Sequence, residues 1–350
     1  MLRTFLTLTA CLLCCYGFNW FLAESIEEVV VHIVNLCGIS IIMAVGLNVT
    51  NGLTGQFSLG HAGFMAVGAY AGAYLTTTLS YIDENTLQYV TAAPVFQSSW
   101  GFIPAIMIGG SAAALVGVVV GTPTLRLKGD YLAIATLGCG EIIQIVITDL
   151  RKVGGAAGLS GIPSMPALPG ISATPGASAT FWIYSFVSLV VLLSLHLQRS
   201  TYGRALIAIR ENELAAEMMG IRTARLKVMA FIYGAFFAGI AGALYGHYQL
   251  SLRPSDFSFV RSIEVVVMLV LGGLGSLTGA IVGAVSLTIL PELLRPVEKQ
   301  LGVAGIRMVV YSLVLIVLML FRPQGIFGQR ELSLRLLRRL LPGARDKGSP

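Results

Sequence analysis

The sequence has little charge for its length. Asp, Glu, Lys and Arg make up only 11% of its 350 residues, whereas soluble domains carry roughly 25%. Hydrophobic residues account for 55%, and several apolar runs reach the ~18–20 residues that a helix needs to cross a bilayer. This composition excludes an ordinary soluble domain and predicts a membrane protein. The net charge of +6 does not indicate nucleic-acid binding, because the basic residues gather in a few loops and in the tail.

Cysteines are few, and their surroundings are apolar. The five of them, Cys11, Cys14, Cys15, Cys37 and Cys139, all lie within apolar runs. Because no pair combines a zinc-like spacing with polar neighbours, we interpret them as buried free thiols. The sequence therefore predicts no metal site and no disulfide.

Motifs for catalysis are also missing. The chain has no G-x-x-x-x-G-K-[ST] phosphate-binding loop, so it cannot hydrolyse ATP alone. Residues 158–161 match the G-x-S-G form of intramembrane serine proteases, but Ser160 lies in a Gly/Pro-rich segment rather than at a helix start. We therefore expect a protein that is not an enzyme and that needs no cofactor of its own.

What the chain does contain is a series of apolar runs separated by short polar segments. The fold predicted from them is an all-α polytopic membrane protein with about eight full transmembrane helices. The predicted spans cover residues 5–22, 29–49, 62–79, 102–121, 131–148, 181–197, 228–249 and 306–320.

The basic residues predict the orientation. Arg3, the Lys and Arg residues of the segment before the seventh span, and the basic C-terminal tail all belong on the cytoplasmic side. The first run lacks a small-residue cleavage site, so we interpret it as a retained span rather than a signal peptide. Residues 1–328 are then a single transmembrane domain, residues 329–350 are a cytoplasmic tail, and both termini lie inside.

The run at residues 263–294 does not fit this alternation. It is too short for two full spans, each of which needs ~17 residues or more plus a turn. Four glycines interrupt its middle: Gly272, Gly273, Gly275 and Gly279. The charged segment before the seventh span and the C-terminal tail are both predicted to lie inside, and the seventh and last spans already supply the two crossings between them. We therefore interpret this run as a broken or re-entrant pair of half-helices that adds no net crossing.

A charged segment, residues 200–227, separates two apolar spans. Good helix formers fill its middle, and Gly220 is placed to end the helix. Such a polar helix cannot lie in hydrocarbon, so it lies on the membrane surface or docks on a soluble partner. For a docking helix, the helical spacing predicts an apolar face of Leu214, Met218 and Ile221 and a charged rim of Arg210, Glu213 and Glu217.

Another glycine-rich region, residues 52–70, faintly echoes residues 272–285. Paired interruptions in the two halves of a transporter mark the solute path, although small residues also recur because they allow close helix packing. Unwound backbone needs protein or water partners, so the two breaks are predicted to lie together. The predicted path residues are Thr54, Gln56, Ser58, His61, Ser276 and Thr278, with Glu141 as an intramembrane carboxylate of either path or structural role. For His61, a hydrogen bond to the unwound backbone is the alternative.

Several motifs in order resemble one family. They are GLNVTNGLTGQFSLGHAGFMAVGAYAGA at residues 46–73, KGDYLAIATL at 128–137, the glycines and leucine at 154–159, FIYGAFFAGIAGAL, VLGGLGSLTGAIVGA and FRPQGIFG. From about residue 29 to 328, the chain is similar to the permease subunits of high-affinity branched-chain amino acid ABC importers. It resembles most the larger of the two paired permeases.

The resemblance implies an assembly and a substrate. The partners would be a homologous second permease, two cytoplasmic subunits that use ATP, and an external solute-binding protein, all at the plasma (inner) membrane of a bacterium. The solutes would be leucine, isoleucine and valine. Urea or short amides remain open as alternatives, since related importers carry them on similar permeases. An ion-coupled secondary transporter is a further alternative, but it would need coupling carboxylates in the spans.

The charged segment also takes a role from the resemblance. Glu213, Ala215, Ala216 and Gly220 resemble a loosened E-A-A…G loop, with which ABC importer permeases contact their ATPases. Here Leu214 stands between the glutamate and the two alanines, which leaves the docking register open.

Overall fold

The computed structural model describes residues 28–77, 79–82, 89–92, 101–127, 129–166 and 177–295, together with single residues at 17, 298 and between 309 and 328. The predicted first span and the basic tail lie outside the described residues, and so does most of the predicted last span.

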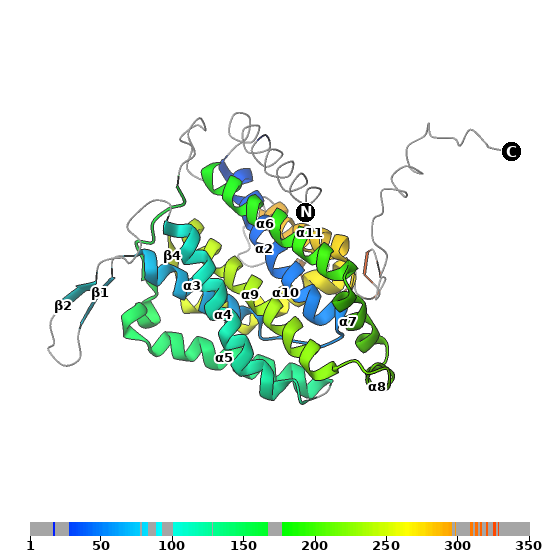
Figure 1. Cartoon of the computed structure of the whole chain (residues 1–350). Helices are drawn as coiled ribbons and strands as arrows, with labels where there is room; N and C mark the ends of the chain where they lie inside the picture. Colours follow the sequence, from blue (N-terminus) through cyan, green and yellow to red (C-terminus); the bar gives the residue numbers. More distant parts are fainter. Residues whose placement is uncertain are drawn as a thin grey trace, which may run out of the picture.

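The described chain is mainly helical (Figure 1). Within it, five helical segments are long and apolar enough to cross a membrane, namely 28–53, 102–124, 130–149, 178–199 and 223–249. This confirms the predicted all-α polytopic membrane fold. The helices are α2 (Glu28–Leu47), α3 (His61–Thr76), α4 (Phe102–Thr124), α5 (Asp130–Asp149), α6 (Ala177–Arg199), α7 (Thr201–Glu211), α8 (Glu213–Met218), α9 (Thr223–Gln249), α10 (Phe259–Gly272) and α11 (Leu277–Leu293).

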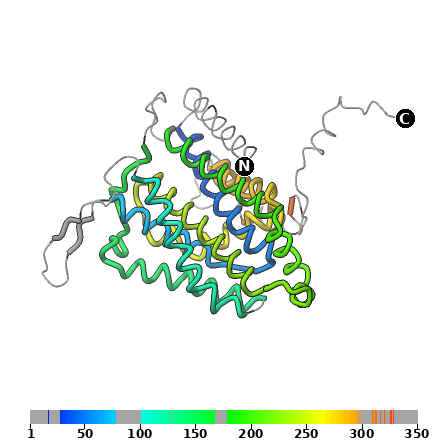
Figure 2. The backbone as a smooth tube through the Cα atoms, viewed as in Figure 1, coloured from blue at the N-terminus to red at the C-terminus, as the bar shows by residue number. Residues whose placement is uncertain are grey.

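Glycines let the central helices pack closely. Helix α9 contacts α3 and α4 more extensively than any other described pair of elements does. A Cβ atom on Gly242 of α9 would overlap the carbonyl oxygen of Met65 on α3, and one on Gly68 would overlap the backbone of Gly239. Such contacts between small residues bring helix backbones close together in membranes. Van der Waals packing then stabilises the association, because the hydrophobic effect does not act between helices in lipid. Around this centre α2 and α11 lie side by side, although they are far apart in the sequence (Figure 2).

Short strands occur in the loops, where the sequence analysis expected none. β1 (Leu79–Ile82) pairs with β2 (Tyr89–Ala92), and β3 (Leu159–Ser160) pairs with β4 (Ser251–Leu252). The second pair joins the loop after α5 to the loop after α9, so both loops lie on one face of the bundle, as the predicted orientation requires. Gly158 allows this contact, because its φ is +83° and a Cβ atom there would overlap the carbonyl oxygen of Leu252.

The predicted broken pair is confirmed. Helices α10 and α11 contain 14 and 17 residues, so they are only ~21 and ~26 Å long at 1.5 Å per residue, which is less than the ~30 Å of a hydrocarbon core. They run antiparallel, because Gly272 lies against Gly279 and Met268 against Gly283. The break between them contains two glycines with positive φ, Gly273 (+116°) and Gly275 (+88°). The pair begins at Phe259, a few residues before the predicted start.

The first break is shorter than predicted. Helix α2 does not end near residue 49 but continues as a π-helical turn, η1 (Asn48–Leu53), and the segment without regular secondary structure covers only residues 54–60. The Thr50 hydroxyl donates to the carbonyl oxygen of Ala230 on α9, at 3.3 Å. This bond holds the polar turn inside the bundle, and single π-helical turns of this kind are frequent at functional sites.

Candidate functional site

The two glycine breaks lie in direct contact. The backbone N–H of Gly275, between α10 and α11, donates to Oδ1 of Asn48 in the π-helical turn, at 3.0 Å. A Cβ atom on Gly52 would lie 2.6 Å from the nitrogen of Gly275 and 2.8 Å from its Cα. Only glycine at both positions allows this approach, so the two interruptions form one structural unit.

Arg210 of α7 reaches into this unit from the charged segment. Its Nη1 donates to the carbonyl oxygen of Gly52 at 2.9 Å, and a Cβ atom on Gly275 would lie 2.6 Å from the same nitrogen. Nε and Nη2 donate to Glu211 at 3.2 and 2.8 Å. The side chain of Arg210 is only 20% exposed. Arg210 was predicted at the rim of a docking face; instead it points inward, because the charged segment packs against the bundle.

The predicted path residues of the first break are buried. Asn51 fixes the position of the irregular segment at residues 54–60, because its side chain accepts from the N–H of Ser58 at 3.2 Å and donates to the Ser58 carbonyl at 3.4 Å. Thr54 donates to the carbonyl oxygen of Thr50. Among the described residues, three buried side chains of this break have polar atoms without a hydrogen-bond partner: Gln56, Ser58 and His61. Buried polar groups usually have partners, so this cluster is a place for water or for a polar solute.

The path residues of the second break help to form its fold. Ser276 is buried, and its hydroxyl accepts from the N–H of Gly279 at 3.1 Å, which caps the start of α11. Thr278 is half-buried, with its hydroxyl 3.1 Å from that of Ser276. The contacts that join the two breaks include Gly52, Asn48 and Gly275.

His61 and Glu141 belong to helices α3 and α5. The His61 ring packs against α9, where a Cβ atom on Gly234 would lie 3.0 Å from its Nε2 and 2.6 Å from the Thr50 hydroxyl, and it stands edge-on to Phe64. Glu141 is half-buried on α5. The predicted proximity of His61 to Ser276 and Thr278, and the path or structural role of Glu141, stay predictions.

Gly60 serves packing between helices. A Cβ atom there would overlap the carbonyl oxygen of Thr136, and one on Gly63 would lie 2.8 Å from the Cα of Gly140. The start of α3 is therefore pressed against α5. A large residue at Gly60 should therefore push these two helices apart.

The charged segment at residues 200–227 contains two short helices, α7 and α8. Asn212 is extended between α7 and α8, and its side chain caps α8 by accepting from the N–H of Ala215 at 3.1 Å. Helix α8 ends at Met218, followed by Gly220 with a φ of +82°, as predicted. Ile221 lies beyond this turn and is half-buried, so it does not share a helical face with the residues of α8.

Helix α8 presents apolar side chains outward and polar ones backward. Leu214 is 70% exposed and Met218 is 89% exposed, one helical turn apart, while Ala216 is buried against the bundle and Ala215 is exposed. Glu213 accepts from Nζ of Lys227 at 2.5 Å, and Glu217 accepts from the Thr223 hydroxyl at 2.6 Å. These two glutamates tie α8 to the start of α9.

Sequence reasoning missed Asn48 and Asn51, which join the two breaks and hold the first of them. Their signal was present, because two asparagines three residues apart interrupt an otherwise apolar span. Intramembrane polar residues usually have a partner inside the protein.

Comparison with known proteins agrees with this architecture. The sequence model of the family described as "Branched-chain amino acid transport system / permease component" matches residues 29–321. The high-affinity branched-chain amino acid transport system permease protein LivM of Escherichia coli is 35% identical, over 87% of this chain and 72% of the relative. The LivH permease of Salmonella typhimurium is 26% identical, over 83% and 92%. A probable LivM of Methanocaldococcus jannaschii is 24% identical, over 84% and 92%. No solved structure matches. The chain belongs to the family of branched-chain amino acid transport system permease components.

Proposed function

We propose that this chain is a permease subunit of an ATP-driven importer that carries leucine, isoleucine and valine across the plasma membrane of a bacterium. The observation that carries the ATP-driven part is the position of Arg210, which links the charged segment to Gly52 and Gly275. A movement of α7 would therefore act directly on both glycine breaks. The substrate class rests on the names of the relatives, which are branched-chain amino acid permeases.

The energy comes from partner subunits. Because the chain lacks a phosphate-binding loop, two cytoplasmic ATP-binding subunits supply hydrolysis. Leu214 and Met218 insert into a groove of one ATPase, in the manner of an amphipathic helix that anchors through residues one turn apart. Glu213 and Glu217 keep α8 fixed on α9, so that a push on α8 is transmitted to the bundle.

The remaining partners follow from transport in one direction. Relatives of both permease kinds, named LivM and LivH, match this chain, so a homologous second permease completes the membrane unit. An external solute-binding protein delivers the amino acid. Within the chain, Gln56, Ser58 and His61 are the polar groups available to the passing solute or to its water, because their polar atoms are buried without partners.

Uptake by cells tests the substrate. Deleting the gene should remove most high-affinity uptake of radioactive leucine and leave urea uptake unchanged, both measured side by side at micromolar solute. Plasmid-borne wild-type gene should restore leucine uptake. Unchanged leucine uptake together with lost urea uptake would assign the protein to the urea or short-amide importers instead.

A further inference from the structure

A cavity with charged lining residues lies at the end of the bundle that is opposite to the charged segment at residues 200–227. It has a volume of about 380 Å³ and opens between α2, α9, α10 and α11. Its wall includes the end of α9, the short helix η5 (Pro254–Phe257), the start of α10 and the end of α11. These ends lie far along α10 and α11 from Gly275, so the proposed orientation places the cavity on the outer side. Its size falls within the range of small-molecule sites, roughly 300–1,000 Å³.

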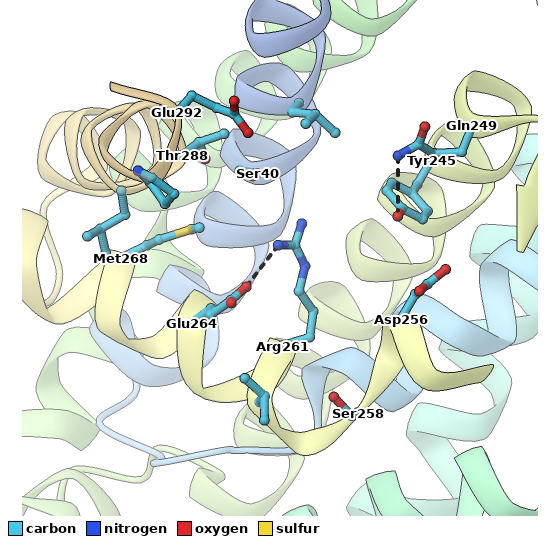
Figure 3. A pocket seen from close by; sticks show the side chains of 14 residues that line it. Ser40, Tyr245, Gln249, Asp256, Ser258, Arg261, Glu264, Met268, Thr288 and Glu292 are labelled. Atoms are coloured by element: carbon cyan, nitrogen blue, oxygen red, sulfur yellow. Dashed lines mark hydrogen bonds and ion pairs between the residues drawn. The ribbon is translucent and has the colours of Figure 1, made fainter. Parts of the chain in front are cut away.

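The polar lining combines one cation with several carboxylates (Figure 3). Nη1 of Arg261 donates to Oε2 of Glu264 at 2.9 Å, and their side chains are 25% and 34% exposed. Figure 3 also shows the carboxylates of Asp256 and Glu292 further from Arg261, on opposite sides of it. Oε2 of Glu292 already pairs with Nη1 of Arg295 at 3.2 Å, so this carboxylate has its second oxygen left for a further partner. A guanidinium carries five N–H donors, and the bond to Glu264 uses one of them. The lining thus holds both an anion-binding group and groups that accept an ammonium.

Part of the remaining lining is apolar, beside the polar side chains of Ser40, Gln249, Ser258 and Thr288. Met268 of α10 and Leu287 of α11 are each only 3% exposed, and Leu36 of α2 lies on the same wall. An aliphatic side chain placed there would leave water for an apolar surface, which is favourable. A small polar solute such as urea would gain nothing from this surface.

The cavity also lies beside the first break. Ser262, the residue after Arg261, accepts with its hydroxyl from the N–H of Ala62 at 3.0 Å. Ala62 follows His61, whose ring nitrogens are buried without partners. The start of α10 therefore contacts both the cavity, through Arg261, and the start of α3, through Ser262.

From these observations we propose that this cavity is the outer solute site of the permease and binds an aliphatic α-amino acid as its zwitterion. The α-carboxylate pairs with Arg261, the ammonium pairs with Glu264 and Glu292, and the side chain packs against Met268 and Leu287. The inference rests on the proposed function and adds the groups that recognise its substrate. A planar guanidinium suits a carboxylate because it donates two parallel hydrogen bonds.

Protection of a thiol tests binding directly. Val260 lines the cavity and is 50% exposed, so Val260→Cys in the complete importer should react with a polar maleimide. Importer with the natural Val260 gives the background from the cysteines already present. Millimolar leucine should slow the labelling several-fold. Leucinol, which lacks the carboxylate, and 4-methylpentanoate, which lacks the ammonium, should not slow it.

Two results of the labelling would overturn the site. Leucine without effect would mean that no amino acid binds there. Equal protection by a simple organic cation such as putrescine would mean that the carboxylates form a cation site instead. Both results are decided by binding alone, so they stand even if the importer carries a different solute.

Transport provides the second test. Arg261→Gln should lower kcat/KM for leucine uptake by about tenfold to a hundredfold, which is the usual cost of losing a charge-assisted hydrogen bond. The matched control is Arg253→Gln, an exposed arginine just before η5 that is not part of the cavity lining; it should keep wild-type uptake. If Arg261→Gln equals Arg253→Gln in an importer that carries leucine, the inferred site is wrong. If the unsubstituted importer carries no leucine, the proposed function is wrong.

Discussion

Gly275→Leu is expected to reduce transport to background while the importer still assembles. The position requires glycine for two reasons. Its φ is +88°, a conformation that costs other residues about 1–2 kcal/mol, and a Cβ atom there would lie 2.6 Å from Nη1 of Arg210 and 3.2 Å from the carbonyl oxygen of Gly52. A side chain must therefore push the two breaks apart and displace the arginine. Uptake of leucine and co-purification of the ATPase, measured on the same preparation, check this expectation.

A control glycine distinguishes the effect of backbone strain from the effect of displacing neighbouring atoms. Gly161 has a φ of +77° and open space around its Cβ position, so Gly161→Ala introduces backbone strain without displacing a neighbour. It should retain most of the uptake. Wild-type uptake by Gly275→Leu would show that the contact between the breaks is not needed for transport.

Leu214→Asp combined with Met218→Asp is expected to abolish co-purification of the ATPase. Burial of Leu or Met contributes about 1.5–3 kcal/mol each, and every 1.4 kcal/mol changes an affinity tenfold. Loss of both anchors should therefore weaken docking by at least about a hundredfold, and an unpaired carboxylate in an apolar groove weakens it further. Because both side chains are largely exposed in the isolated chain, the variant should fold normally.

The neighbouring methionine is the control. Met219 is 82% exposed and directly follows the last residue of α8, so Met219→Asp places one carboxylate beside the anchors rather than on them. It should keep the ATPase bound. Continued co-purification and transport by the double variant would mean that α8 is an interfacial helix on the lipid headgroups.

Hydropathy and glycine placement were enough to predict the helices and the broken pair. The span at residues 102–121 became α4, and the glycines at 272–279 ended one short helix and began another. Periodicity alone did not predict that α2 continues through Asn48 and Asn51. Polar residues in a helix suggest an end, whereas here Asn48 has its partner at Gly275 and Thr50 has its partner on α9, both far away in the sequence.

The site was harder to predict for the same reason. An arginine in a charged segment is expected to be exposed to solvent. Only the folded chain brings Arg210 to Gly52. Arg261 likewise lines a cavity together with Asp256 and Glu292, which belong to other elements of the fold. Local patterns predicted which segments were special, but the contacts between those segments depend on tertiary packing.

The energy source is the central claim, and uptake into proteoliposomes tests it most directly. For this test the chain is reconstituted with the proposed partner permease, ATPases and binding protein. Leucine uptake is measured with ATP, without ATP, and with ATP after ionophores have collapsed the sodium and proton gradients. The account predicts uptake that requires ATP and is indifferent to the ionophores. Uptake that persists without ATP and disappears with the ion gradients would contradict it and identify an ion-coupled secondary transporter.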